Sequence, residues 1–133
     1  MKSRPPRSGA AADPNAADRL PAYDRARALR ATGDSADVAD QLLGRFLAEL
    51  PDTTQRLRAA LHEADWDALW ALAHRVRGAA AICGTVALAA VVDELERGIK
   101  ARERGAAEQA IAEFACQVAR LQARTREPGP GDR

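Results

Sequence analysis

Aromatic residues are scarce in this chain, making up 4% of its 133 residues. β-Strands usually recruit more aromatic and β-branched side chains, whereas the 47% hydrophobic share here consists mostly of Ala, Leu and Val. We therefore expect an all-α protein. Its length suits one hydrophobic core, so we expect a single domain.

A charge excess of one sign is also missing, because 20 basic and 19 acidic residues give a formal net charge of +1. This balance creates no one-sided field, so neither nucleic acid nor a membrane surface is expected as a partner. No apolar run approaches the roughly 20 residues that cross a bilayer. The basic N-terminus also lacks the apolar stretch of a secretory signal.

Cysteine and histidine are too few and too scattered for a metal centre. Cys83 and Cys116 have no C-x-x-C spacing, and both fall in apolar helical patterns, so we expect reduced thiols in the core. His62 lies in His-Glu-Ala-Asp and lacks the His-Glu-x-x-His spacing of zinc sites. It is expected to be a solvated residue near a helix end.

The two ends of the chain have the composition of linkers. Residues 1–18 are rich in Pro, Ala, Ser and Gly and predict a flexible leader or interdomain linker. Residues 127–133 alternate Pro and Gly, which can neither continue a helix nor build a core, and predict a disordered tail. The folded domain is expected over residues 19–126.

Between these ends, apolar residues recur three and four positions apart, as amphipathic helices require. The expected helices cover residues 23–31, about 36–63, 66–83, about 86–104 and about 106–125. Pro51 falls inside the second segment and predicts a kink or brief break there. Expected N-caps are Asp34 or Ser35, Asp65 and Thr85, and expected helix ends are Gly33 and Gly84.

Four of these helices are long and carry one apolar stripe each. Such helices bury their stripes best as an antiparallel up-down four-helix bundle, with the extra short N-terminal helix capping one end. The expected inward residues of the last three helices are Leu69, Leu72, Ala73, Val76, Ala80 and Cys83; Val86, Leu88, Ala89, Val92, Leu95 and Ile99; and Ile111, Phe114, Ala115, Val118 and Leu121.

His74 falls on the opposite side of its helix from that stripe, at about 100° of rotation per residue. Its outward face is shared by Asp67, Trp70, Ala71, Arg77, Gly78 and Ala81. Arg75 lies about 100° round the helix, at the rim of this face. A Gly in mid-helix costs about 0.5–1 kcal/mol against Ala, so Gly78 indicates close approach by another surface.

An imidazole, largely neutral near pH 7, has a free ring nitrogen that can attack an activated phosphoryl group. Arg77, one turn from His74, can hydrogen-bond the phosphoryl oxygens. From position alone, however, an ordinary exposed histidine is the better interpretation of His74, because exposed histidines are common.

The segment Ala73-His74-Arg75-Val76-Arg77-Gly78, followed by Gly84, resembles the signature of histidine-containing phosphotransfer (HPt) domains, Ala-His-x-Leu-Lys-Gly with a Gly six residues later. The resemblance extends upstream to Phe46-Leu47-Ala48-Glu49-Leu50-Pro51 and Asp65-Trp66 and downstream to Leu95-Glu96, covering roughly residues 23–123. Val76 and Arg77 depart from the usual Leu and Lys. Arg keeps the cation but presents a planar fork.

The resemblance implies that His74 is the phospho-acceptor, Arg77 its supporting cation and Gly78 the point of close approach. It implies a bacterial phosphorelay protein of the cytoplasm, either free-standing or the cytoplasmic end of a membrane-bound sensor kinase. Its partners would be response-regulator receiver domains, such as that of a hybrid sensor histidine kinase, and these domains would supply Mg²⁺. No cofactor and no ATP-binding or autokinase activity are expected, and the monomer is the default state.

A rival interpretation is a helical docking module that is never phosphorylated. In it, Trp70, Ala71, Arg75, Gly78 and Ala81 bind a partner while His74 does no chemistry. Trp70 has a further alternative, which is packing against the short first helix.

Overall fold

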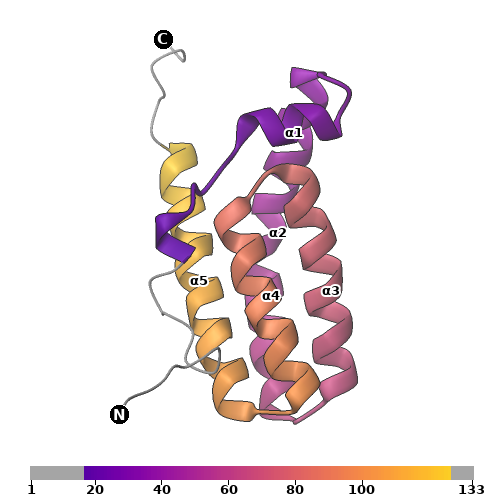
Figure 1. Ribbon diagram of the computed structural model, residues 1–133, viewed down its shortest axis with the longest axis vertical. Coiled ribbons are helices and arrows are strands. Elements are labelled where there is room, and N and C mark those ends of the chain that lie inside the picture. The colour runs from indigo at the N-terminus through magenta and orange to yellow at the C-terminus, as the bar shows by residue number, and fades with distance from the viewer. Residues whose placement is uncertain (1–16, 127–133) are drawn as a thin grey trace, which may run out of the picture.

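The computed structural model describes residues 17–126, and within them it contains helices and no strand. The elements are the 3-10 turn η1 (Ala17–Arg19) and the helices α1 (Arg25–Ala31), α2 (Ala36–His62), α3 (Trp66–Cys83), α4 (Val86–Ala101) and α5 (Arg104–Arg126). Helices α2 to α5 run side by side as an antiparallel bundle, and α1 lies across one end of it (Figure 1). The all-α bundle predicted from the sequence is confirmed.

The helix boundaries follow from local capping chemistry. The side chains of Asp24, Ser35 and Asp65 each accept a hydrogen bond from the backbone N–H three residues on, which satisfies an orphan donor of the first turn. Gly84 ends α3 with a left-handed φ of 72°. Thr85 differs from the expectation, because its hydroxyl donates to the carbonyl of Ala80 in α3 and makes no cap bond to α4.

Pro51 does not divide α2, which runs as one helix from Ala36 to His62. The prediction of one helix is confirmed, and there is no break. Proline removes one backbone donor from a helix interior, but Leu50 directly before it and Leu57 six residues after it are fully buried, and this packing holds the helix together on both sides of the missing bond.

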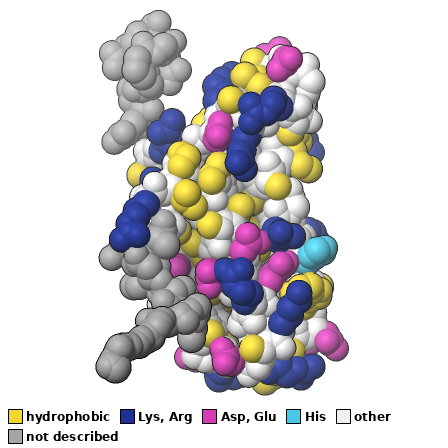
Figure 2. Space-filling view, in the orientation of Figure 1, with side chains coloured by type: hydrophobic (Ala, Val, Ile, Leu, Met, Phe, Trp, Pro, Cys, Tyr) yellow, Lys and Arg dark blue, Asp and Glu magenta, His cyan; other side chains and the backbone are white. Residues whose placement is uncertain are grey.

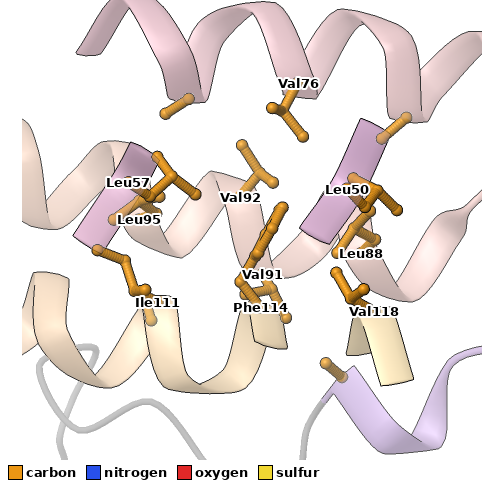
Figure 3. Close-up of a cluster of buried hydrophobic side chains, with 14 of the residues drawn as sticks. Leu50, Leu57, Val76, Leu88, Val91, Val92, Leu95, Ile111, Phe114 and Val118 are labelled. Atoms are coloured by element: carbon orange, nitrogen blue, oxygen red, sulfur yellow. The ribbon is translucent and has the colours of Figure 1, made fainter. Parts of the chain in front are cut away.

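The core is made of aliphatic side chains from all four long helices. Figure 3 shows this cluster, in which Leu50 and Leu57 of α2 and Val76 of α3 meet side chains of α4 and α5 around Phe114. Phe114 is the largest of the fully buried side chains. Small residues let the helices approach closely: a Cβ at Gly98 of α4 would stand 3.2 Å from the backbone nitrogen of Ala107 in α5.

The predicted inward stripes hold at most positions of α3 and α5, but Leu72 of α3 and Ala115 of α5 are only half-buried, because they lie at the edge of the buried stripe of each helix. The stripe of α4 needs a larger correction. Leu88, Val92, Leu95 and Ile99 are buried as expected, whereas Val86 and Ala89 are only half-buried. Ala87 and Val91, which were not expected in the core, are buried. The reason is that α4 packs against α3, α5 and η1, so its buried arc is wider than one stripe.

Two further expectations differ from the structure. Cys83 is buried as predicted, but Cys116 is exposed, because it lies on the outer side of α5 between the buried Phe114 and Val118. Structure also begins before residue 19, since Ala17 is buried and Asp18 accepts a hydrogen bond from Gln117 at 2.6 Å. The rest of the predicted leader, residues 1–16, and the predicted tail, residues 127–133, lie outside the described residues.

Gly84 fastens α1 to the end of the bundle. Its carbonyl accepts a hydrogen bond from the backbone of Asp24 at 2.7 Å. A Cβ on Gly84 would collide with the carbonyl oxygen of Asp24 and stand 3.3 Å from the Cβ of Ala28. The glycine is therefore required both by its φ and by the close approach of α1.

The surface carries charges of both signs. Figure 2 shows basic and acidic side chains interspersed over one face, without a patch of a single sign, in keeping with the net charge of +1. No helix within residues 17–126 combines the length and the apolar character needed to cross a membrane.

Candidate functional site

His74 projects from the middle of α3 into solvent, with 64% of its side chain exposed. The same helix buries Ala73 and Val76 on its inner side, so the turn that anchors the imidazole is fixed by the core. The outward position predicted for His74 is confirmed. The structure also surrounds it with residues of α4 that the helical periodicity of α3 could not identify.

Glu96 of α4 faces one nitrogen of the imidazole. Its Oε2 lies 3.3 Å from Nδ1 of His74, and only 12% of the Glu96 side chain is exposed. A carboxylate accepts hydrogen bonds and cannot donate them when ionised, so this contact favours the tautomer with the proton on Nδ1. The other nitrogen, Nε2, then keeps its lone pair.

Arg77 is held by two carboxylates of α4. Its Nε donates to Oδ1 of Asp93 at 2.5 Å and lies 3.7 Å from Oε1 of Glu96. The hydrogen bond and charge of Asp93, followed by the charge of Glu96, raise the pKa of Arg77 above its ordinary value. Both contacts use Nε, which leaves the two terminal nitrogens of the guanidinium for other acceptors.

Trp70 covers one face of the His74 ring. Its ring stacks on the imidazole, with 5.7 Å between centroids and 15° between planes, and Nζ of Lys100 lies 5.4 Å from the indole centroid. Trp70 is half-buried against the core. The alternative that it packs against the short first helix is wrong, because α1 contacts α3 at the far end, around Gly84.

A hollow of about 300 Å³ opens on the side of His74 away from Trp70. Its walls are small or polar, and the lining residues are His74, Arg77, Gly78, Ala81, Ala89 and Asp93. Apart from the chain neighbours and the nearby backbone of α3 itself, no atom of residues 17–126 lies within 4 Å of a Cβ built on Gly78. Packing among the described residues therefore gives no reason for a glycine at this position.

The remaining predicted site residues lie apart from that hollow. Ala71 is exposed on α3 but does not line it. Arg75 instead lines a larger groove of about 440 Å³ between α2 and α3, whose apolar floor includes Phe46, Leu72 and Val76. His62 is exposed as the last residue of α2, as expected.

Sequence reasoning assigned no role to Asp93, Glu96 or Lys100. They lie 16 to 30 residues along the chain from the α3 side chains that they contact, and periodicity within α3 says nothing about which residues of α4 oppose it. The available signal was their spacing: these residues share one face of α4, at intervals of three and four. That face is the counterpart of Trp70, His74 and Arg77.

Within residues 17–126, the structure groups no three His, Cys, Asp or Glu side chains in an arrangement that could hold a metal ion. The described site combines an imidazole whose Nδ1 faces Glu96 with an arginine whose contacts to α4 use Nε.

Comparison with known proteins identifies the fold family. The Hpt domain family matches residues 41–124, from the second turn of α2 to the end of α5, which is more than half of the chain. No curated protein and no solved structure was found to match the sequence of this chain. The match spans the bundle, His74 and the facing side chains of α4. The chain therefore belongs to the Hpt domain family, whose members transfer phosphoryl groups through a histidine in phosphorelays.

Proposed function

We propose that this protein accepts a phosphoryl group on Nε2 of His74 from the aspartate of one receiver domain and passes it to the aspartate of another. The observation that carries the proposal is the orientation of the imidazole. Its Nδ1 faces Glu96 at 3.3 Å, while the ring is 64% exposed, so Nε2 is the nitrogen open to a partner.

The transfer step needs no co-reactant. The lone pair of Nε2 attacks the phosphorus of the receiver's acyl phosphate, the N–P bond forms, and the P–O bond breaks to release the aspartate carboxylate. The ring becomes an imidazolium that keeps its proton on Nδ1, and the carboxylate of Glu96 offsets this positive charge. Because the proton stays in place, the imidazole can leave again as a neutral group, and the reaction can run in either direction.

Arg77 supports the phosphorylated state in this proposal. Its Nε stays with Asp93, while its terminal nitrogens hydrogen-bond the phosphoryl oxygens. An arginine guanidinium is always protonated under these conditions, so its charge is present before and after transfer. Asp93 thus orients Arg77 beside His74 but also competes with the phosphoryl group for its charge.

The partners in this proposal are receiver domains, as the family match indicates. In the transfer, Mg²⁺ and the acidic pocket that binds it come from the receiver domain, which approaches across the small surface of Gly78, Ala81 and Ala89. We propose that the protein works as a monomeric carrier without autokinase activity in the bacterial cytoplasm. Its receivers include that of a hybrid sensor histidine kinase.

The test is incubation of the purified protein with a phosphorylated receiver or with acetyl phosphate. We expect one acid-labile, base-stable phosphoryl group per chain, and none in His74→Gln, which should keep its helical content and unfolding temperature because the position is exposed. Labelling of His74→Gln at the wild-type level would contradict the assignment. Partner binding without any labelling of the wild type would favour the docking module.

A further inference from the structure

Trp70 is a large aromatic residue whose ring is stacked on the imidazole of His74. It precedes His74 by one helical turn of α3, and its ring lies almost parallel to the imidazole, at an interplanar angle of 15°. The indole is half-buried against the core, so it cannot move freely with the exposed ring that it touches. Trp70 is therefore a fixed surface against which His74 lies.

An exposed histidine needs such a surface if it is to react in one orientation. The hydrogen bond to Glu96 fixes one edge of the imidazole, but a single contact of 3.3 Å leaves the ring free to tilt and to change rotamer. A neighbour stacked on the face of the ring restricts both the tilt and the change of rotamer. The two contacts together hold Nδ1 towards α4 and Nε2 towards solvent.

Lys100 of α4 in turn holds the indole. Its ammonium lies 5.4 Å from the centre of the Trp70 ring, within the range of a cation–π interaction. No carboxylate of the described residues forms an ion pair with Lys100, whereas Arg97, three residues earlier on α4, is paired with Glu94. The aromatic ring is thus the contact that Lys100 makes at this site.

We propose that Trp70 is a positioning residue for phosphoryl transfer, which together with Glu96 keeps the His74 imidazole in one rotamer with Nε2 outward, and that Lys100 secures the indole in this role. The inference rests on the proposed function of His74. Stacked aromatic pairs are worth enough to change a population or rate by about 2- to 10-fold, and this is the loss expected when the stack is removed.

The first experiment measures the rotamer of His74 without any phosphorylation. Three-bond couplings from the backbone nitrogen and carbonyl carbon to Cγ of His74 report its χ1 distribution by NMR. We expect a single rotamer in the wild type and in Trp70→Phe, and averaged couplings in Trp70→Leu, which keeps an apolar side chain but not the stack. Unchanged couplings in Trp70→Leu would overturn the proposal, whatever His74 does chemically.

The second experiment measures single-turnover transfer from a phosphorylated receiver as a function of receiver concentration. For Trp70→Leu we expect the maximal rate to fall about 2- to 10-fold while the half-saturating concentration stays the same, and for Trp70→Phe a rate near the wild type. A raised half-saturating concentration at an unchanged maximal rate would overturn the proposal, because it would make Trp70 a docking contact.

Lys100 is tested with Lys100→Met, which keeps the aliphatic stem and removes the ammonium, against Arg97→Met as the matched loss of one charge. Lys100→Met should shift the His74 couplings in the same direction as Trp70→Leu, and Arg97→Met should not. Equal couplings in both variants would overturn the role of Lys100. If the wild type accepts no phosphoryl group, the proposed function fails, while the NMR couplings still decide whether Trp70 positions the ring.

Discussion

At the scale of single residues, Arg77 is the side chain for whose charge two carboxylates of α4 and the phosphoryl group compete. Its guanidinium is shared between Asp93, Glu96 and, after transfer, the phosphoryl group. We expect Arg77→Ala to move the equilibrium between phospho-His74 and phospho-receiver towards the receiver by about two- to fivefold, the scale of an exposed ion pair. Arg77→Lys should recover part of the loss, because it keeps the charge without the planar fork.

The matched variant for this prediction is Asp93→Asn, which removes the competing carboxylate and leaves Arg77 in place. It should shift the same equilibrium the other way, towards phospho-His74. The measurement is the ratio of the two phosphorylated proteins after mixing, at low and high salt. Identical ratios in wild type, Arg77→Ala and Asp93→Asn would eliminate a direct contact between Arg77 and the phosphoryl group.

The two cysteines differ in reactivity for a reason that lies in their burial. Burial raises the pKa of the Cys83 thiol, because removal from water disfavours the charged thiolate. The thiolate is the reactive form of cysteine, and an ordinary thiol begins to ionise near pH 8. At this pH the buried Cys83 should therefore stay unreactive, whereas the exposed Cys116 should react. Titration with a chromogenic disulfide should find one fast thiol per native chain and two after unfolding. A fast thiol remaining in Cys116→Ser would refute this.

At the scale of helices, the two glycines of the signature segment have different tasks. Gly84 is demanded by the fold, since its φ is 72° and α1 rests on it. Gly78 is demanded by nothing in the described residues outside its own helix, because the space around it is open. Gly44 is equally open, but only Gly78 lines the hollow beside His74, where a side chain would stand between the imidazole and a partner.

Gly78→Leu should therefore impair transfer without harming the fold. Leu is the better helix former, so the free energy of unfolding should rise by roughly 0.5–1 kcal/mol, while the branched side chain fills the hollow beside His74 and slows transfer at least tenfold. Gly44 offers a matched control, because it lies inside α2, is equally open and is not part of the hollow. Gly44→Leu should gain stability and keep the transfer rate. Equal rates in both variants would show that Gly78 is outside the contact surface.

How far the sequence predicts such elements depends on how many neighbours each one has. Helix α3 faces the core with one stripe, and the predicted residues from Leu69 to Cys83 describe it except for the half-buried Leu72. Helix α4 is enclosed on three sides, so Ala87 and Val91 are buried although a single stripe omits them. For the same reason His74 and Arg77 were predictable from α3 alone, whereas Glu96 and Asp93 required knowledge of the pairing between two helices.

At the scale of the whole molecule, the N-terminal segment is fastened to the bundle on the side formed by α4 and α5. Nη2 of Arg120 donates to the carbonyl of Leu20 at 2.9 Å, and Nη1 donates to the side chain of Gln117 at 3.2 Å. Gln117 is buried and donates to Asp18. Pro21 then accepts a hydrogen bond from the backbone of Ala87, which connects the segment to the start of α4. A set of polar contacts thus fixes the path of the chain into α1.

Arg120→Ala should destabilise the folded protein without changing its chemistry. The variant leaves the carbonyl of Leu20 and the amide of Gln117 without a charged donor in a partly buried place, which costs about 1–3 kcal/mol. His74 is on the surface shared by α3 and α4 and contacts none of these groups, so the transfer rate per folded molecule should equal that of the wild type. Urea denaturation measures the loss of stability, and single-turnover transfer at urea concentrations below the unfolding transition measures the transfer rate.

The matched control is Arg124→Ala, which removes an exposed arginine one turn further along α5 and should change neither stability nor transfer rate. A slower transfer in Arg120→Ala at full folding would mean that the N-terminal segment and the His74 face are coupled through α4, and the separation of stability from chemistry argued here would be wrong.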